Sequence, residues 1–246
     1  MVVRRLVVIF TYLAILMRPA IAASPPEGRI SYFESSGHQV AVDVVRPLQP
    51  GPYPVILLLY GRGGLSFYGP GFVQLSQTLA DAGFAVLTPH YFDASASPDS
   101  PEVTGVSFET WRKALDDALA FAARLPDVDP KRIGVVGVSL GGFLAAVEAA
   151  QDERVAALVS ESAGVSTWFP KHPTRMAPLL IVHSREDTIV PLSDAEHLAE
   201  IARSFRVEPE FALYDGRKHV LTGDAAQSAN ERIVDFFARI LRRSVP

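Results

Sequence analysis

Ser139 stands in a stretch whose residue types suit a nucleophile. Gly137, Ser139 and Gly141 match the pattern G-x-S-x-G within VGVSLGG, between an apolar segment and an Ala-rich one. A strand that turns sharply into a helix strains its apex residue, and only small neighbours two residues before and after leave room for it. The apex hydroxyl would lie beside the helix N-terminus, where backbone amides favour negative charge. The pattern predicts a nucleophilic serine; the alternative is a serine that serves only the turn.

A serine hydroxyl needs a general base, and the chain has six histidines. His219, in LYDGRKHVL, follows the last predicted strand and precedes the last predicted helix, so we predict it to be the base. The other five are expected at a turn, in loops, at a strand end or within a helix: His38, His90, His172, His183 and His197. Of these, the loop residues His90 and His172 remain open alternatives.

A carboxylate must orient the imidazole and stabilise its cation. Asp187 follows the apolar segment LLIVHS by three residues, and we predict it for this role. Glu161, at the end of the preceding predicted strand, is the second choice. Glu186 is expected to face solvent, and a turn role suits Asp215 better.

Donors for an oxyanion are expected from two main-chain amides. Leu140, directly after the predicted nucleophile, would supply one of them. The segment YGRGG, residues 60–64, follows a buried strand and would supply the other from Arg62 or Gly61. A phosphate-binding loop is the alternative for these glycines, but no GK[ST] follows them.

The elements that must position these residues alternate between strand and helix. RISYFES and QVAVDVVRP alternate apolar and polar residues around a turn and predict an antiparallel hairpin. Continuous apolar runs then predict buried strands, and segments with helical periodicity lie between them. The predicted strands are 54–60, 84–89, 132–138, 154–162, 179–184 and 208–215, and the predicted helices are 71–83, 107–126, 140–150, 193–205 and 224–243.

This order predicts an α/β fold with a mostly parallel sheet, an antiparallel N-terminal hairpin and helices on both faces. Ligands of such sheets bind beyond the carboxyl ends of the strands, where the candidate catalytic residues are placed. Ser193 and Asp224 are predicted N-caps of the last two helices.

The N-terminus has the three parts of a secretory signal peptide. A basic start is followed by an apolar run of 12 residues, Leu6–Met17, and by the small-x-small site Ala20-Ile21-Ala22. We therefore expect residues 1–22 to be a signal peptide, residues 23–246 to be one hydrolase domain, and the protein to be exported, periplasmic or secreted. The alternative is an uncleaved anchor, although a spanning helix needs about 20 apolar residues.

Charge and composition argue against some partners. Cleavage after Ala22 would remove three arginines and no acid, so the formal charge would change from −4 to −7. No basic cluster remains for a phosphate backbone, so we expect no nucleic-acid partner and no stable membrane insertion after cleavage. The chain has no cysteine, and we expect neither a metal nor another cofactor.

The chain resembles the α/β-hydrolases and, within them, dienelactone hydrolase-like proteins. The resemblance rests on LLLYGRGG, LTPHYF, GVVGVSLGG, HSREDTIVP, GRKHVL and ANERIVDFF. The order Ser139, Asp187, His219 is the order of the triad in that fold. Dienelactone hydrolases proper use a cysteine nucleophile, so the resemblance implies a serine-nucleophile variant, a serine carboxylesterase that works through an acyl-enzyme.

The segment between residues 161 and 177 is too short for a large lid, so we expect an open, shallow site. Aromatic residues would line it, namely some of Tyr60, Phe67, Tyr68, His90, Tyr91, Phe92, Trp168 and Phe169, with Tyr60, His90, Tyr91 and Trp168 as the predicted substrate-binding residues. Such a rim suits a small-molecule substrate, a small or moderately apolar ester or lactone. The alternatives are a single-domain peptidase-like or lactone-specific hydrolase of this fold, or a catalytically silent binding protein.

Overall fold

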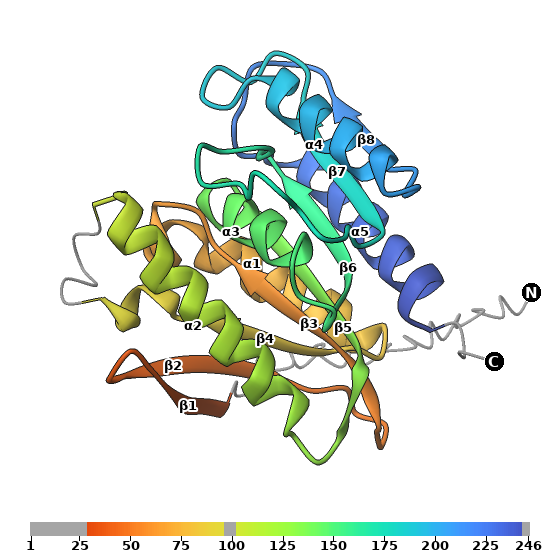
Figure 1. The fold of residues 1–246 in the computed structure, drawn as a ribbon. Coiled ribbons are helices and arrows are strands. Elements are labelled where there is room, and N and C mark those ends of the chain that lie inside the picture. The colour runs from red at the N-terminus through yellow and green to blue at the C-terminus, as the bar shows by residue number, and fades with distance from the viewer. Residues whose placement is uncertain (1–28, 96–101, 243–246) are drawn as a thin grey trace, which may run out of the picture.

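The computed structural model describes residues 29–95 and 102–242 (Figure 1). The predicted signal peptide, residues 1–22, and its cleavage site lie outside the described residues. Within the described part, no helix is both long and apolar enough to cross a membrane.

A single sheet of eight strands, in the order β1-β2-β4-β3-β5-β6-β7-β8, forms the middle layer of the domain. β1 pairs antiparallel with β2, and β2 pairs antiparallel with β4, whereas all the other neighbours run parallel. The strands are β1 Arg29–Ser35, β2 His38–Val45, β3 Tyr53–Leu59, β4 Ala85–Pro89, β5 Val128–Val138, β6 Val155–Glu161, β7 Leu179–Ser184 and β8 Glu210–Tyr214. This confirms the predicted hairpin followed by a mostly parallel sheet.

Helices cover both faces of the sheet, as the alternating sequence pattern predicts. The helices are α1 Gly64–Asp81, η1 Tyr91–Ala94 (a 3₁₀ turn), α2 Gly105–Ala123, α3 Leu140–Ala149, α4 Leu192–Ser204 and α5 Asp224–Leu241. In Figure 1, α2, α3 and α4 lie in front of the sheet, and α1 and α5 lie behind it. The two rear helices also contact one another.

The start of α1 differs most from the sequence prediction. α1 begins at Gly64 and contains Pro70, although the sequence predicts a start after that proline. Tyr68 and Phe72 extend the buried stripe of this helix toward its N-terminus, so packing outweighs the hydrogen bond lost at the proline.

The predicted N-caps Ser193 and Asp224 are wrong. Pro191 and Gly223 occupy the cap positions, and the predicted residues lie inside the first turns of α4 and α5. Neither cap position carries a side-chain hydrogen bond. The acidic side chains Asp194 and Asp224 instead lie in the first turns, where the helix dipole favours negative charge.

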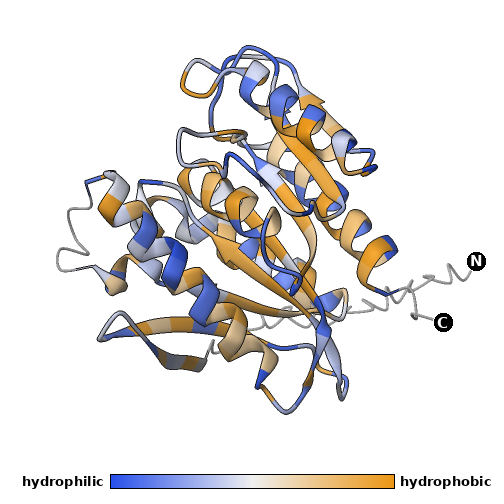
Figure 2. Cartoon of the chain, in the orientation of Figure 1, coloured by the Kyte–Doolittle hydropathy of each residue, from blue (hydrophilic) through white to orange (hydrophobic). Residues whose placement is uncertain are grey.

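The core consists of the central strands and the inner faces of the helices (Figure 2). Every residue of β3 is buried, as expected for a parallel strand covered on both faces. On the rear face, the ring of Phe237 from α5 packs against β5 at Gly134, where an added Cβ would lie 2.5 Å from that ring. Gly134 is therefore required for the close approach of α5 to the sheet.

We expect Phe237→Ala to lower the free energy of unfolding by about 3–5 kcal/mol, because it leaves a cavity against β5. Phe237 is 0% exposed, whereas Val73 on α1 is 63% exposed. Val73→Ala is the control and should change stability by less than about 0.5 kcal/mol. Urea denaturation measures the free energy of unfolding of both variants. Equal losses of stability in the two would contradict the packing of Phe237 against β5.

Candidate active site

Ser139 occupies the turn between β5 and α3 in a strained conformation, with φ 53° and ψ −118°. Its glycine neighbours have no space for a side chain. A Cβ on Gly137 would lie 2.2 Å from the carbonyl oxygen of Gly141, and one on Gly141 would lie 2.3 Å from that of Leu59. The small residues of VGVSLGG are thus required because α3 starts directly against the end of β5.

Ser139, His219 and Asp187 form one hydrogen-bonded chain. His219 Nε2 lies 2.9 Å from Ser139 Oγ, and His219 Nδ1 lies 2.8 Å from Asp187 Oδ2. The three residues follow β5, β8 and β7, so the carboxyl ends of separate strands bring them together. The structure therefore places all three predicted residues in the arrangement that proton transfer from the serine requires.

Asp187 is held as a carboxylate by its surroundings. Its side chain is fully buried, which by itself would raise the pKa. The amide N–H groups of Ile189 and Val190 donate to Oδ1 at 2.8 and 3.0 Å, and His219 contacts the other oxygen. These interactions outweigh burial, so the pKa of Asp187 lies below its ordinary value.

Two serines that the sequence analysis missed fasten the loop that carries His219. Ser162 Oγ donates to the carbonyl oxygen of His219. Ser184 Oγ donates to that of Lys218 at 2.6 Å. Ser162 directly follows β6, which lies beside β5, and Ser184 ends β7, which lies beside β8. This position at the carboxyl end of a predicted strand is the one feature of the sequence that could have identified them.

The predicted oxyanion donors come from two segments, the start of α3 and the turn after β3. Leu140 is the first residue of α3, and Gly61 and Arg62 lie on the turn between β3 and α1. The amides of Leu140 and Arg62 donate to no acceptor among the described residues. Both therefore have the hydrogen-bonding capacity that an oxyanion needs.

Tyr68 from α1 is a further polar group at this point. Its hydroxyl packs on Gly61, where an added Cβ would lie 2.3 Å away. Burial raises the pKa of Tyr68, and the charge of Glu161 raises it further, whereas its interaction with Ser139 lowers it. The tyrosine therefore stays protonated beside the serine.

Tyr60 and Tyr91 were predicted to bind substrate on an open surface, but the structure buries both. They are 2% and 0% exposed, and their rings stack at 4.4 Å. Tyr91 donates its hydroxyl hydrogen to the carbonyl oxygen of Tyr60 at 2.6 Å, directly before Gly61. The two rings thus pack beneath the turn at Gly61 and Arg62 and do not line a surface.

His90 and Trp168, the other predicted substrate-binding residues, also have protein partners. His90 Nε2 lies 3.0 Å from Asp43 Oδ2, and this hydrogen bond raises the pKa of His90 despite partial burial. Trp168 stacks on Phe108 of α2 at 4.6 Å. Neither residue lines the cavity described next.

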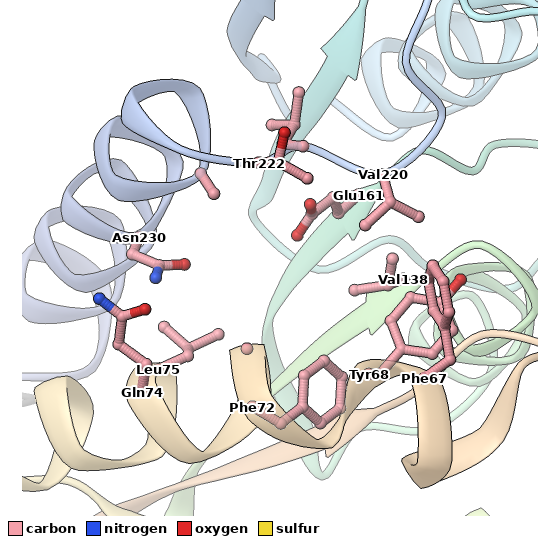
Figure 3. A pocket seen from close by; sticks show the side chains of 13 residues that line it. Phe67, Tyr68, Phe72, Gln74, Leu75, Val138, Glu161, Val220, Thr222 and Asn230 are labelled. Atoms are coloured by element: carbon pink, nitrogen blue, oxygen red, sulfur yellow. The ribbon is translucent and has the colours of Figure 1, made fainter.

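A cavity of about 260 Å³ lies on the face of the sheet that α1 and α5 cover (Figure 3). Ser139, Asp187 and His219 are not among its lining residues, but the cavity reaches their immediate neighbours. It lies between α1, the ends of β5 and β6, the loop after His219, and α5. Val138 and Val220, the chain neighbours of Ser139 and His219, form part of its wall. Phe67 and Tyr68 are the only residues of the predicted aromatic rim that line it.

Glu161, the second choice for the triad carboxylate, points into this cavity (Figure 3). It has no ion pair with His219 or with any other described residue. Although the residue keeps some exposed surface, burial of its carboxyl group raises the pKa to about 7. The structure therefore pairs His219 with Asp187 and not with Glu161.

The described residues contain one acidic group with metal-ligand spacing, Asp116, Glu148 and Asp152. Arg154 pairs with both aspartates, and Arg112 pairs with Glu148 at 3.4 Å. These arginines already balance the charge that would attract a cation, and the group lies outside the cavity beside Ser139.

Comparison with known proteins places the chain among hydrolases. The family model described as "Dienelactone hydrolase family" matches residues 40–241. A protein from Synechocystis sp. named "Putative carboxymethylenebutenolidase" is 23% identical over 212 residues, which cover 78% of this chain and 85% of the relative.

Solved structures show the same fold. A thermophilic esterase from Thermogutta terrifontis, with propionate bound, superposes with a TM-score of 0.69 at 17% identity and covers 90% of this chain and 97% of its own. Est1E from Butyrivibrio proteoclasticus has a TM-score of 0.68 at 18% identity and covers 88% of this chain and 100% of its own.

We expect Glu161→Gln to stabilise the protein more at high pH than at low pH. The folded state holds the Glu161 proton up to a pKa of about 7, above the ordinary 4.5, so the wild type loses stability as pH rises between these values. The free energy of unfolding of the variant, minus that of the wild type, should increase by up to about 3 kcal/mol from pH 4.5 to pH 8.

Urea denaturation across this pH range measures the difference in unfolding free energy. Glu186→Gln is the matched control, because it removes the same charge from an exposed position beside Asp187. Its effect should stay below about 0.5 kcal/mol. A Glu161→Gln difference that does not change with pH would contradict the assignment of a buried, unpaired carboxyl.

Proposed function

The chain belongs to the dienelactone hydrolase family and is a hydrolase of the α/β fold, and from this premise we propose that it cleaves carboxylic esters through an acyl-enzyme on Ser139. The observation that carries the proposal is the hydrogen-bonded chain from Ser139 through His219 to Asp187. It supplies an activated nucleophile, a general base and an orienting carboxylate in one line.

Acylation begins when Ser139 Oγ attacks the ester carbonyl carbon and His219 Nε2 takes the hydroxyl proton. Asp187, with its pKa below the ordinary value, stays ionised and stabilises the imidazolium. The tetrahedral intermediate then collapses, the bond to the alcohol oxygen breaks, and His219 gives its proton to that oxygen. A water molecule repeats the sequence on the acyl-enzyme and releases the acid and the free serine.

The negative oxygen of the intermediate would lie between the amides of Leu140 and Arg62, which have no acceptor among the described residues. The Tyr68 hydroxyl is a third donor at this point. It stays protonated through the pH range of the reaction because burial raises its pKa. All three donors are held by secondary structure or packing before the substrate arrives, so little reorganisation is required.

The cavity of about 260 Å³ supports small or moderately apolar esters and lactones as substrates. Its wall is largely apolar near Ser139, at Val138, Val220 and Phe72, so a short acyl chain would be buried there. Export through residues 1–22 stays part of this proposal, supported by the sequence pattern alone.

We expect Ser139→Ala to lower kcat for p-nitrophenyl butyrate by at least about 10³-fold, since the nucleophile is lost. Asp187→Asn should lower it by about 10³–10⁴-fold, because an amide no longer holds the reactive tautomer of His219. A fluorophosphonate probe should label the wild type at Ser139 and should not label Ser139→Ala. It should label His219→Ala much more slowly than the wild type.

Asp215→Asn is the matched control for Asp187→Asn. Asp215 lies on the same loop as His219, with a side chain 96% exposed, and should keep activity within about two-fold. Wild-type turnover no faster than that of Ser139→Ala would contradict the proposal. Failure of the probe to label the wild type would favour a binding protein on this scaffold.

We expect Ser184→Ala and Ser162→Ala each to lower kcat about ten-fold while KM changes little. Each substitution removes the donor that fixes a carbonyl of the His219 loop, which costs about 1–1.5 kcal/mol of positioning. The rate of fluorophosphonate labelling should fall with kcat. Ser204→Ala, which removes an equivalent hydrogen bond to Ile201 in α4, is the control and should leave both rates unchanged. Unchanged labelling in both loop variants would contradict this role.

A further inference from the structure

The cavity beside Ser139 carries one acidic group and no basic one. Of its 13 described lining residues, Glu161 is the only one with a charge at neutral pH, and none is lysine, arginine or histidine. Gln74, Asn230 and Thr222 add neutral polar groups on the side toward α1 and α5. A ligand that fills the cavity therefore meets an acidic, partly apolar surface.

The Glu161 carboxyl has no partner within the described chain. No hydrogen bond or ion pair to it is present among the described residues, whereas the buried Glu148 pairs with Arg112. Desolvation alone accounts for its raised pKa. An unpaired buried carboxyl is costly to keep, and a partner supplied by a ligand would remove that cost.

The carboxyl is close to the reaction centre. Glu161 is the register partner of Val138, and its carbonyl oxygen accepts a hydrogen bond from the Ser139 amide at 2.9 Å. The main chains of neighbouring strands are about 4.8 Å apart. The Tyr68 hydroxyl interacts with both Ser139 and the Glu161 carboxylate, so a group bound by Glu161 lies close to an ester carbonyl attacked by Ser139. Paired residues point to the same face, here the one covered by α1 and α5.

Aromatic rings next to the carboxyl favour a cation over a neutral hydrogen-bond donor. Phe67, Tyr68 and Phe72 line the same cavity, with the rings of Phe67 and Tyr68 edge-to-face at 4.9 Å. Aromatic faces attract ammonium groups, most strongly where water is excluded. A carboxylate with aromatic neighbours provides both parts of an ammonium site.

We propose that Glu161 binds a positively charged amine of the substrate, so that the preferred esters carry an ammonium group within about four bonds of the scissile carbonyl. The proposal rests on the proposed esterase function and names its substrate class. Carboxylated esters are correspondingly disfavoured, because their charge repels that of Glu161.

Two isosteric pairs of esters test this, one for each side of the scissile bond. On the acyl side, p-nitrophenyl β-alaninate is compared with p-nitrophenyl butyrate. On the alcohol side, butyrylcholine is compared with 3,3-dimethylbutyl butyrate, with acid release followed by titration. In each pair the ratio of kcat/KM for the charged ester to that for the neutral one is measured, in the wild type, Glu161→Gln and Glu186→Gln.

We expect the wild type to prefer the charged member of at least one pair by about ten-fold at pH 8, and Glu161→Gln to abolish that preference. Glu186→Gln, the exposed matched control, should keep it. A ratio equal in the wild type and Glu161→Gln for both pairs would overturn the proposal. A general loss of folded protein lowers kcat/KM for both esters of a pair by the same factor, so it leaves their ratio unchanged.

The preference should also rise with pH through about 7, as Glu161 becomes ionised. Among the described residues that line the cavity, Tyr68 of α1 is the only other titratable group, and burial raises its pKa further from this range. The β5 wall, the loop 220–222 and α5 contribute no titratable side chain to it. His219 is the general base for both esters of a pair, so its titration affects both values of kcat/KM equally and cancels in their ratio.

A binding measurement separates this proposal from the esterase function. In Ser139→Ala, calorimetry should detect butyrylcholine binding that weakens about ten-fold in Ser139→Ala/Glu161→Gln. Equal binding by the two proteins overturns the cation site whether or not the wild type hydrolyses esters. Absence of Ser139-dependent hydrolysis of the neutral esters overturns the esterase function alone.

Discussion

The contact between Gly137 and Gly141 is the constraint on which the rest of the site depends. The main chain of α3 lies so close to β5 that not one additional carbon fits between them. This proximity forces Ser139 into positive φ, sets the Leu140 amide at the start of a helix, and brings α3 against the end of β3. The Ser139 hydroxyl, the N-terminus of α3 and the turn after β3 are therefore brought together by one steric constraint.

The other segments that meet at Ser139 are held by hydrogen bonds to the main chain. Asp187 is fixed by two amides of its own loop, and the His219 loop is fixed by serines of two other strands. The oxyanion turn is fixed in the same way, by Tyr91 at the carbonyl of Tyr60. Each segment is irregular in conformation, but each has its carbonyl or amide groups bound, which makes the geometry reproducible without regular secondary structure.

Much of this arrangement follows from the sequence, because strand ends in a parallel sheet meet at one edge. The order of elements and the positions of Ser139, Asp187 and His219 obey that rule. The serines 162 and 184 could not be predicted, since their partners are carbonyls distant in sequence. Tyr60 and Tyr91 were placed on the surface because their position after strands does not reveal that they stack on one another.

The two helices behind the sheet, α1 and α5, contribute to a different part of the site than the strands they cover. Ser139, Asp187 and His219 follow β5, β7 and β8, whereas α1 and α5 form most of the wall of the cavity and contact each other directly. Substitutions along that helix pair can therefore widen, narrow or repolarise the cavity while the triad stays in place. For the proposed esterase, the shape of most of the cavity wall can therefore change without a change in the reacting groups, except at Val138 and Glu161, which the strands contribute.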